Sequence, residues 1–440
     1  MMHKIAFFLT ILLFLGALAQ ADTPAAATKS AYISVDELQP GMKGYGLTVF
    51  QGIKPERFDV ELVSVMRNYN AGRDAFIIRC LDKRFDIARG VQGCSGSPVY
   101  FDGRLAGAMA FGWSYGTEPL YGVTPIAQML EVKDAAHKGL EGADARRRAL
   151  LDKTDYNTLM TDELFSDEQI TAWMSKSMFH RSLNDREIDS VSLGPLMIAN
   201  GIDSHAMEEL QSWLGPLRME AAAGSGGIKN ADDLENLQLV PGTTVTSPLM
   251  MGDINGAVLG TVTEVIDDKV YAFGHAWNGE GPVMWPLATG YIHTFISRTS
   301  MSFKLGDALK VVGVLRADEA TAVFGTVGET PTMIPITIEV SWPYRNDART
   351  FISQIAQDEL ETPMLAAMVL TGALNQKGGM PRFHHLRYEG ELRFKDFAPL
   401  TFNGVDTGGG SRGLAREMFS LIGYMPVSYT HLRAHETKAN

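Results

Sequence analysis

The stretch GVQGCSGSPVYFDGRLAGAMAFG, from Gly90 to Gly112, decides how the rest of this chain is interpreted. Gly93 and Gly96 enclose Cys94 and Ser95, and a glycine lets the backbone turn sharply and approach a ligand where a Cβ would obstruct it. Such a loop can present a nucleophile, with the amides of Gly93 and Ser95 as an oxyanion hole. A tight turn between two strands, with no catalytic role, accounts equally well for the hexapeptide GCSGSP at residues 93–98.

The residues after this loop predict a β-hairpin. Ser97 to Phe101 and Arg104 to Phe111 are rich in strand-forming residues, and Asp102-Gly103 between them is a favoured two-residue turn. Alternating patterns upstream predict strands at 58–65 and 74–81. The first block, residues 30–132, is therefore predicted to be compact and mostly β.

The composition limits the kinds of partner. The chain has 440 residues, of which 45% are hydrophobic and 20% charged, enough for two or three globular domains. The formal net charge of −12 argues against nucleic acid or an anionic membrane as a partner, because both need clustered Lys and Arg. No group of His, Cys, Asp and Glu has the spacing of a zinc or calcium site, so we expect no metal and no cofactor.

The N-terminus predicts export. His3 and Lys4 precede an apolar run from Ile5 to Ala19, and the small residues that follow fit cleavage after Ala19 or Ala21. This pattern is typical of a secretory signal peptide over residues 1–21, and the run is too short for a comfortable membrane span. The mature protein is expected to be periplasmic or secreted, without a lasting membrane span.

Changes in composition divide the rest of the chain. We predict a charged helical insertion at 133–190, a strand-helix-strand segment at 191–230, a second β-rich half at 240–340, and an accessory domain at 341–426 with a helix near 351–374. Residues 427–440 resemble translated sequencing-adapter read-through, so they are left out of the fold, and the native protein is expected to continue past them.

The chain has two cysteines, Cys80 and Cys94. An oxidising compartment permits a disulfide between them, and two isolated buried thiols are the alternative. Cys94 is a weaker candidate for the nucleophile than Ser95, because Ser95 occupies the position that the loop presents.

A serine nucleophile needs a base within hydrogen-bond reach, oriented by a third group. His3 leaves with the signal peptide, so the base must come from later in the chain. The candidates before the excluded tail are His137, His180, His205, His275, His293, His384 and His385. Only His275 follows a glycine at the end of a predicted hairpin strand, where it can point into a cleft, and structural packing is the alternative for it.

The orienting acid is expected shortly before the serine loop. Asp82 stands at the end of the strand predicted at 74–81, and Asp86 is the second candidate. Either carboxylate can instead cap a turn or pair with a neighbouring basic residue, namely Lys83, Arg84 or Arg89.

These motifs resemble the SpoIVB (sporulation stage IV B) peptidase family. The family's serine loop reads GxVQGMSGSP and precedes a similar hairpin, and FDVELVSV, the strand ending in Asp82, and YGVTPIAQML resemble it as well. In the second half, GTVTEVIDDKVYAFGH resembles the family's GTxTxxD…YxxLGH segment, and TAVFGTVGE resembles its FGxFGT element. The resemblance covers roughly residues 31–132 and 240–328.

The resemblance implies a Ser-His-Asp triad with Ser95 as nucleophile, His275 as base and Asp82 as the third member. It also implies a mostly β, chymotrypsin-like double β-barrel core. Three features depart from the family. The serine half precedes the histidine half, so the core is permuted; the spacing from Asp82 to the serine loop is about two residues shorter; and Cys94 replaces a methionine.

We therefore expect an exported serine endopeptidase that acts on polypeptides. The rival from another class is a catalytically inactive envelope module that binds peptides or extended polypeptide in the same cleft. A structural β scaffold of the cell envelope is a third possibility.

Overall fold

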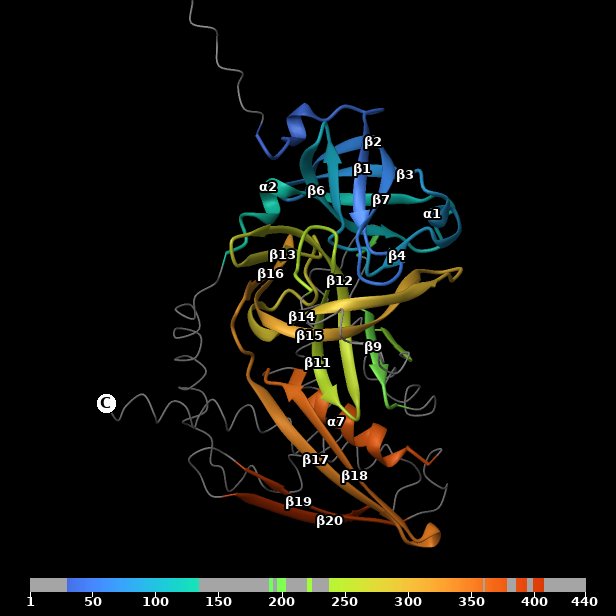
Figure 1. Cartoon of the computed structure of the whole chain (residues 1–440), viewed down its shortest axis with the longest axis vertical. Coiled ribbons are helices and arrows are strands. Elements are labelled where there is room, and N and C mark those ends of the chain that lie inside the picture. The colour runs from blue at the N-terminus through green and yellow to red at the C-terminus, as the bar shows by residue number, and fades with distance from the viewer. Residues whose placement is uncertain are drawn as a thin grey trace, which may run out of the picture. The chain divides into compact units, whose positions relative to one another are not determined.

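Strands dominate the part of the chain that the structure describes (Figure 1). The computed structural model describes residues 30–133, 190–192, 196–202, 220–223, 237–358, 361–377, 385–393 and 399–406. The predicted signal peptide, nearly all of the charged insertion, the predicted helix within 191–230, and the tail lie outside these residues. No helix in the described ranges is long and apolar enough to cross a membrane.

Six strands between residues 43 and 125 close into a first barrel, in blue to teal in Figure 1. They are β1 (Lys43–Thr48), β2 (Glu56–Asn70), β3 (Arg73–Cys80), β5 (Pro98–Phe101), β6 (Arg104–Trp113) and β7 (Leu120–Pro125). The order is β5-β1-β2-β3-β7-β6, and β6 pairs back with β5, which closes the ring. β8 (Ser190–Ser192) adds to the outside of β6. The predicted mostly β first block is confirmed.

The β5–β6 hairpin forms at the predicted place. Asp102 and Gly103 have φ angles of 51° and 73°, the two left-handed residues of a type I′ turn. Inside the barrel, Phe58, Phe76 and Phe101 are buried, and their rings belong to one apolar cluster. A Cβ on Gly46 would lie 2.2 Å from the Phe58 ring, so this position of β1 has room only for glycine.

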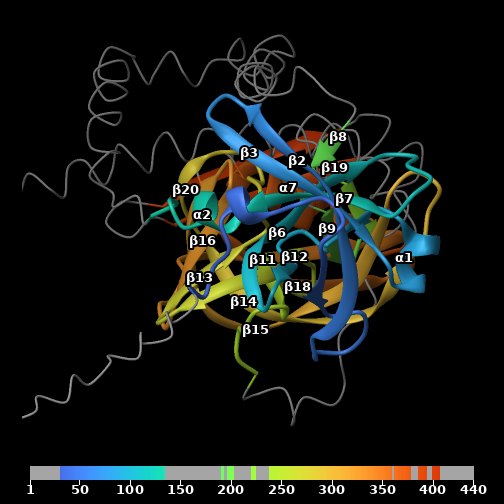
Figure 2. The ribbon, with the colours of Figure 1, turned by 90° about the horizontal axis from the view of Figure 1, so that it is seen from above.

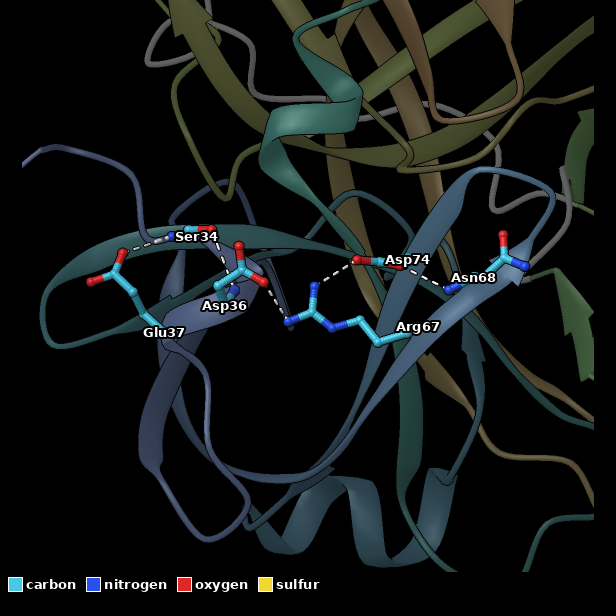
Figure 3. Close-up of polar contacts among 6 residues, drawn as sticks. All are labelled: Ser34, Asp36, Glu37, Arg67, Asn68 and Asp74. Atoms are coloured by element: carbon cyan, nitrogen blue, oxygen red, sulfur yellow. Dashed lines mark hydrogen bonds and ion pairs between the residues drawn. The ribbon is translucent and has the colours of Figure 1, made fainter.

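A polar network ties the short 3-10 helix η1 (Val35–Glu37) to the β2–β3 hairpin. Figure 3 shows its members, Ser34, Asp36, Glu37, Arg67, Asn68 and Asp74. Arg67 lies 2.7 Å from an oxygen of Asp36 and 2.8 Å from one of Asp74. Ser34 and Glu37 form a capping box at the start of η1. These contacts lie at the surface. They hold η1 against the β2–β3 hairpin, and we assign them no catalytic or binding role.

A second ring of six strands closes between residues 244 and 327. Its members are β11 (Thr244–Gly252), β12 (Asn255–Ile266), β13 (Lys269–Ala272), β14 (Gly281–Ile296), β15 (Ser302–Glu319) and β16 (Ala322–Val327). They run in the order β12-β13-β16-β15-β14-β11, and β11 pairs with β12 to close the ring. The protein is therefore a double β-barrel, as the resemblance to the SpoIVB peptidase family implies, and Figure 2 shows the first barrel from above.

The second sheet continues beyond its barrel on both edges. β9 (Leu196–Asn200) pairs with β12 and carries β10 (Glu220–Ala223) in parallel, while β18 (Asp347–Ala356) pairs with β11 and carries β17 (Met333–Trp342). η5 (Pro343–Arg345) joins β17 to β18, and α7 (Glu361–Leu374) contributes its side chains to the same apolar core. β19 (Leu386–Leu392) and β20 (Leu400–Asp406) form a separate two-stranded sheet.

The segment after residue 341 differs from its prediction in two ways. The expected domain boundary falls inside β17, which belongs to the second sheet. Residues 351–356, predicted as helix, are the end of β18, where Phe351, Ser353 and Ile355 are buried while Ile352 is 61% exposed. This alternation has the period of a strand, and the helix begins only at Glu361.

The two barrels are joined by hydrogen bonds along one seam. β4 (Val91–Gln92), from the first half, pairs in parallel with the start of β15, and Gly52 bridges to Ile292. Close by, α1 (Lys83–Ala88) ends at the seam, where the Ser302 hydroxyl donates to the Ala88 carbonyl at 2.7 Å. At the other end, α2 (Ile126–Met129) follows β7, and Thr321 donates to the Gln128 carbonyl. The serine loop lies on this seam.

Candidate active site

The serine loop links β4 to β5 and is shaped by two left-handed glycines. Gly93 and Gly96 have φ angles of 88° and 91°, which a residue with a Cβ adopts only with strain. A Cβ on Gly96 would also lie 1.9 Å from the carbonyl oxygen of Thr261 and 2.5 Å from the amide nitrogen of Phe273. The glycine thus permits both the turn and the close approach of the second barrel.

β12 of the second barrel donates hydrogen bonds to three carbonyl groups of the serine loop. The Thr261 amide donates to the Ser95 carbonyl at 2.8 Å, and the Thr261 hydroxyl donates to the Gly93 carbonyl at 2.9 Å. The Thr263 hydroxyl donates to the Gly96 carbonyl at 2.7 Å. The conformation of the loop therefore depends on both barrels, and the hairpin alone does not set it.

A buried lysine on β15 supports the same loop. Lys304 is 1% exposed, and its Nζ lies 2.7 Å from the Thr48 hydroxyl and 3.3 Å from the Thr261 hydroxyl. The Thr48 hydroxyl also accepts a hydrogen bond from Ser97 at 3.0 Å. Burial lowers the pKa of the Lys304 amine, and in the described part of the chain no carboxylate pairs with it. The local sequence around Lys304 does not indicate this role, because the role depends on the contact of β15 with Thr48 of the first barrel.

His275 lies in the bend that follows β13. Phe273 and Gly274 before it have φ angles of 66° and 70°, so the chain turns sharply there. The Thr124 hydroxyl of the first barrel donates to the Gly274 carbonyl at 2.7 Å. A Cβ on Gly274 would lie 3.3 Å from the Met109 carbonyl oxygen, so β6 packs directly against this bend. The histidine loop is held by the first barrel, just as the serine loop is held by the second.

The structure brings the serine loop and the histidine loop together. The Met109 carbonyl oxygen accepts the Gly96 amide at 2.7 Å and also faces Gly274, so both loops touch the same peptide group. Ser95 is 1% exposed and His275 is 8% exposed. The Ser95 hydroxyl and the His275 Nε2 atom are both buried, and neither has a hydrogen-bond partner among the residues that the structure describes. Buried polar atoms are normally paired, so two unpaired ones in adjacent loops need an explanation.

The hydrogen bonding of His275 sets its tautomer. Its Nδ1 atom lies 2.7 Å from the carbonyl oxygen of Ala276, and a carbonyl only accepts, so Nδ1 carries the proton. Nε2 therefore has a free lone pair. Burial lowers the pKa of His275 to about 4, and the Ala276 carbonyl opposes that shift only in part. At neutral pH His275 is an uncharged base.

The amides of the serine loop divide into used and unused donors. Those of Cys94, Gly96 and Ser97 donate to the carbonyls of Val91, Met109 and Cys94. Among the described loop and turn hydrogen bonds, the Gly93 and Ser95 amides have no backbone acceptor. These two donors are the ones that the sequence assigns to an oxyanion hole.

Comparison with known proteins adds to this geometry. Residues 14–130 match the SpoIVB peptidase S55 family. The matched stretch is about a quarter of the chain, and it includes the first barrel with its serine loop but ends before His275. The match indicates a serine peptidase. No curated protein and no solved structure matches the chain.

Within the S55 match, Asp82 has a role other than the one expected for a triad acid. It is the N-cap of α1, where it accepts from the Arg84 amide at 2.9 Å and pairs with the Arg84 guanidinium at 2.8 Å. The Arg84 side chain holds the pKa of Asp82 below its usual value. No hydrogen bond or ion pair joins Asp82 to His275 in the described residues, and the group on Nδ1 is Ala276. Asp86, the second candidate, is exposed on α1.

We expect replacement of Asp82 to affect stability rather than catalysis. Asp82→Ala removes the helix cap and should cost about 1 kcal/mol of unfolding free energy, whereas Asp82→Asn keeps a capping side chain and should cost less. Denaturant unfolding measures both. The rate of peptide hydrolysis should stay within about threefold in Asp82→Asn, whereas a direct triad acid would lose about 10⁴-fold in kcat. A loss of kcat of that size in Asp82→Asn would show that Asp82 is the triad acid.

Neither His293 nor either cysteine thiol is a better candidate for the base or the nucleophile. Nε2 of His293, on β14, pairs with Asp307 at 2.9 Å, so that nitrogen is occupied. His137, His180, His205 and His384 lie outside the described residues, and His385 directly precedes β19. Cys80 and Cys94 are both buried free thiols, the second of the two alternatives. Burial raises the pKa of each thiol, so neither is an activated nucleophile.

Proposed function

We propose that this protein is a serine endopeptidase with Ser95 as the nucleophile and His275 as the general base. One observation carries the proposal, namely that the Ser95 hydroxyl and the His275 Nε2 atom are buried and unpaired in two loops that touch. Nucleophilic catalysis uses a serine hydroxyl with a neutral imidazole as its base, and in the described residues neither atom is engaged by another group. The S55 match over the serine loop supports the same chemistry.

The chemistry follows from the free atoms. His275 Nε2 takes the proton from the Ser95 hydroxyl as its oxygen attacks the carbonyl carbon of a peptide bond. The negative charge that develops on the substrate oxygen is met by the amides of Gly93 and Ser95, which have no backbone acceptor among the loop hydrogen bonds. His275 then returns the proton to the leaving amine, and water hydrolyses the ester on Ser95.

The burial of Ser95 limits how a substrate can reach it. The Ser95 hydroxyl is shielded from solvent, and no hydrogen bond joins it to His275. We propose that a peptide bond reaches Ser95 only when residues around the loop move, and that the hydrogen bond between Ser95 and His275 forms in the complex. Catalytic hydrogen bonds in unliganded sites are often long and tighten when substrate binds.

We propose further that the protein acts outside the cytoplasm. Support comes from the basic and apolar pattern of residues 1–21, which is typical of a secretory signal peptide. The substrate would then be an exported or extracellular polypeptide.

The proposal is tested by incubating the purified protein with an unfolded polypeptide and identifying new N-termini by mass spectrometry. We expect internal cleavage that prior treatment with a fluorophosphonate abolishes. A folded protein that binds the polypeptide without cleaving it, and does not react with the fluorophosphonate, would instead be the peptide-binding module.

A further inference from the structure

A carboxylate on β15 organises the loop that follows His275. Asp318 is 0% exposed, and its Oδ1 accepts the amide of Trp277 at 2.6 Å. Its Oδ2 accepts three more amides, from Asn278 and Gly279 at 2.8 Å each and from Glu280 at 3.3 Å. Four successive amides of one loop thus converge on one side chain.

One of these four amides shares a peptide group with the hydrogen bond of His275. The peptide between Ala276 and Trp277 accepts the Nδ1 proton of His275 on its carbonyl oxygen and donates its N–H to Asp318. Asp318, this peptide and the imidazole therefore form an unbroken chain of two hydrogen bonds. Hydrogen bonds in such chains polarise one another, so a negative charge at one end makes the carbonyl at the other a better acceptor.

We propose that Asp318 is the acid of this catalytic site and acts on His275 through the Ala276–Trp277 peptide as a positioning residue. The inference rests on the proposed role of His275 as base. When His275 takes the Ser95 proton, the imidazolium places its positive charge on a carbonyl that Asp318 has already polarised. Asp318 stays ionised and the peptide stays intact, so the only proton that moves is the one between Ser95 and His275.

The other carboxyl groups near this loop have different partners. Glu280 and Glu361 both bind the side-chain amide of Asn278, at 3.2 Å and 3.0 Å. Burial raises the pKa of Asp318, and the hydrogen bonds from the four amides oppose that rise. Each of the four amides donates its proton, so the carboxyl oxygens of Asp318 act as acceptors in all four contacts. In the described part of the chain no Lys or Arg forms an ion pair with Asp318, so the four amides are the groups that oppose the effect of burial.

The test compares Asp318→Asn with the wild type in two measurements. For hydrolysis of a quenched fluorogenic peptide made from an identified cleavage site, we expect kcat to fall about 10- to 100-fold, the usual loss for an outer-shell partner, with KM within twofold. By NMR of [¹³Cε1]-histidine, we expect the pKa of His275 to drop by about one unit, which is a tenfold lower proton affinity. A purely structural role would leave the pKa of the folded protein unchanged.

The matched control is Asp307→Asn, which removes a buried carboxylate from the same strand that pairs with His293. It should leave kcat and the His275 pKa unchanged. An unchanged His275 pKa in folded Asp318→Asn overturns the inference, even if kcat falls. If the wild type cleaves nothing, the proposed function fails, and the His275 titration still decides the role of Asp318.

A measurement on the wild type covers the case in which Asp318→Asn does not fold. The amide resonance of Trp277 and the carboxyl ¹³C resonance of Asp318 should both respond to the protonation of His275, with the same midpoint. Absence of a response at Asp318 would show that the two groups are not coupled, and the inference would be overturned.

Discussion

Ser95→Ala is expected to abolish covalent labelling by a fluorophosphonate and to lower kcat for peptide hydrolysis by about 10⁶-fold, as loss of the nucleophile does in serine peptidases. The physical reason is that alanine removes the hydroxyl that attacks the carbonyl carbon in the proposed mechanism. Gel fluorescence with the labelled probe and mass spectrometry of the adduct measure the effect. The small side chain leaves the glycine turns intact, so the variant should fold normally.

The structure offers a matched control for this substitution. Ser247, on β11, is also fully buried with a hydroxyl that has no partner, but it belongs to a strand rather than to the serine loop. Ser247→Ala should label at the wild-type rate. Labelling that persists in Ser95→Ala, with the adduct on another residue, would show that the nucleophile lies elsewhere.

His275→Gln is expected to lower kcat by a similar factor of about 10⁶, because nucleophile and base act as a unit. In the wild type, kcat/KM should stay level from neutral pH down to about 5 and fall to half near pH 4, where the buried imidazole takes up a proton. The sign follows from the lowered pKa: the neutral form is the active base, and burial extends its range toward acid.

The pH profile has its own control. His293→Gln changes a histidine on β14 whose Nε2 pairs with Asp307. The fall of kcat/KM at acid pH should therefore have the same midpoint in this variant as in the wild type. An acid limb of the wild type near pH 6.5, the ordinary value for histidine, would mean that His275 is hydrated in the working enzyme or is not the base.

The strands that could be predicted are those with a local signal. The hairpin at Asp102-Gly103 forms as expected because only a few residues tolerate two successive left-handed positions. The helix predicted near 351–374 begins as strand, because Phe351 to Ala356 pair with Met333 to Ile338 of β17. That pairing partner lies outside any local window, so composition alone favoured the helix.

The candidate site divides in the same way. The prediction of Ser95 rests on its glycines and that of His275 on its place after a hairpin strand, both of which are local features, and their catalytic roles stay predictions. Asp82 was chosen by its position before the serine loop, and the structure places it on Arg84 instead. The group that binds His275 is the Ala276 carbonyl, which no side-chain pattern reveals, and Asp318 binds the next amide of that loop from the far end of β15.

The sequence by itself determined the β class, the turns, and which loops carry a serine and a histidine, because backbone sterics and strand periodicity act over a few residues. Only the tertiary structure decided that these loops meet and which groups hold the loop of His275. Those outcomes depend on two closed barrels packing along one seam, where Thr261 and Met109 fix both loops at once. Contacts between residues distant in the chain arise from that packing, and no local pattern specifies them.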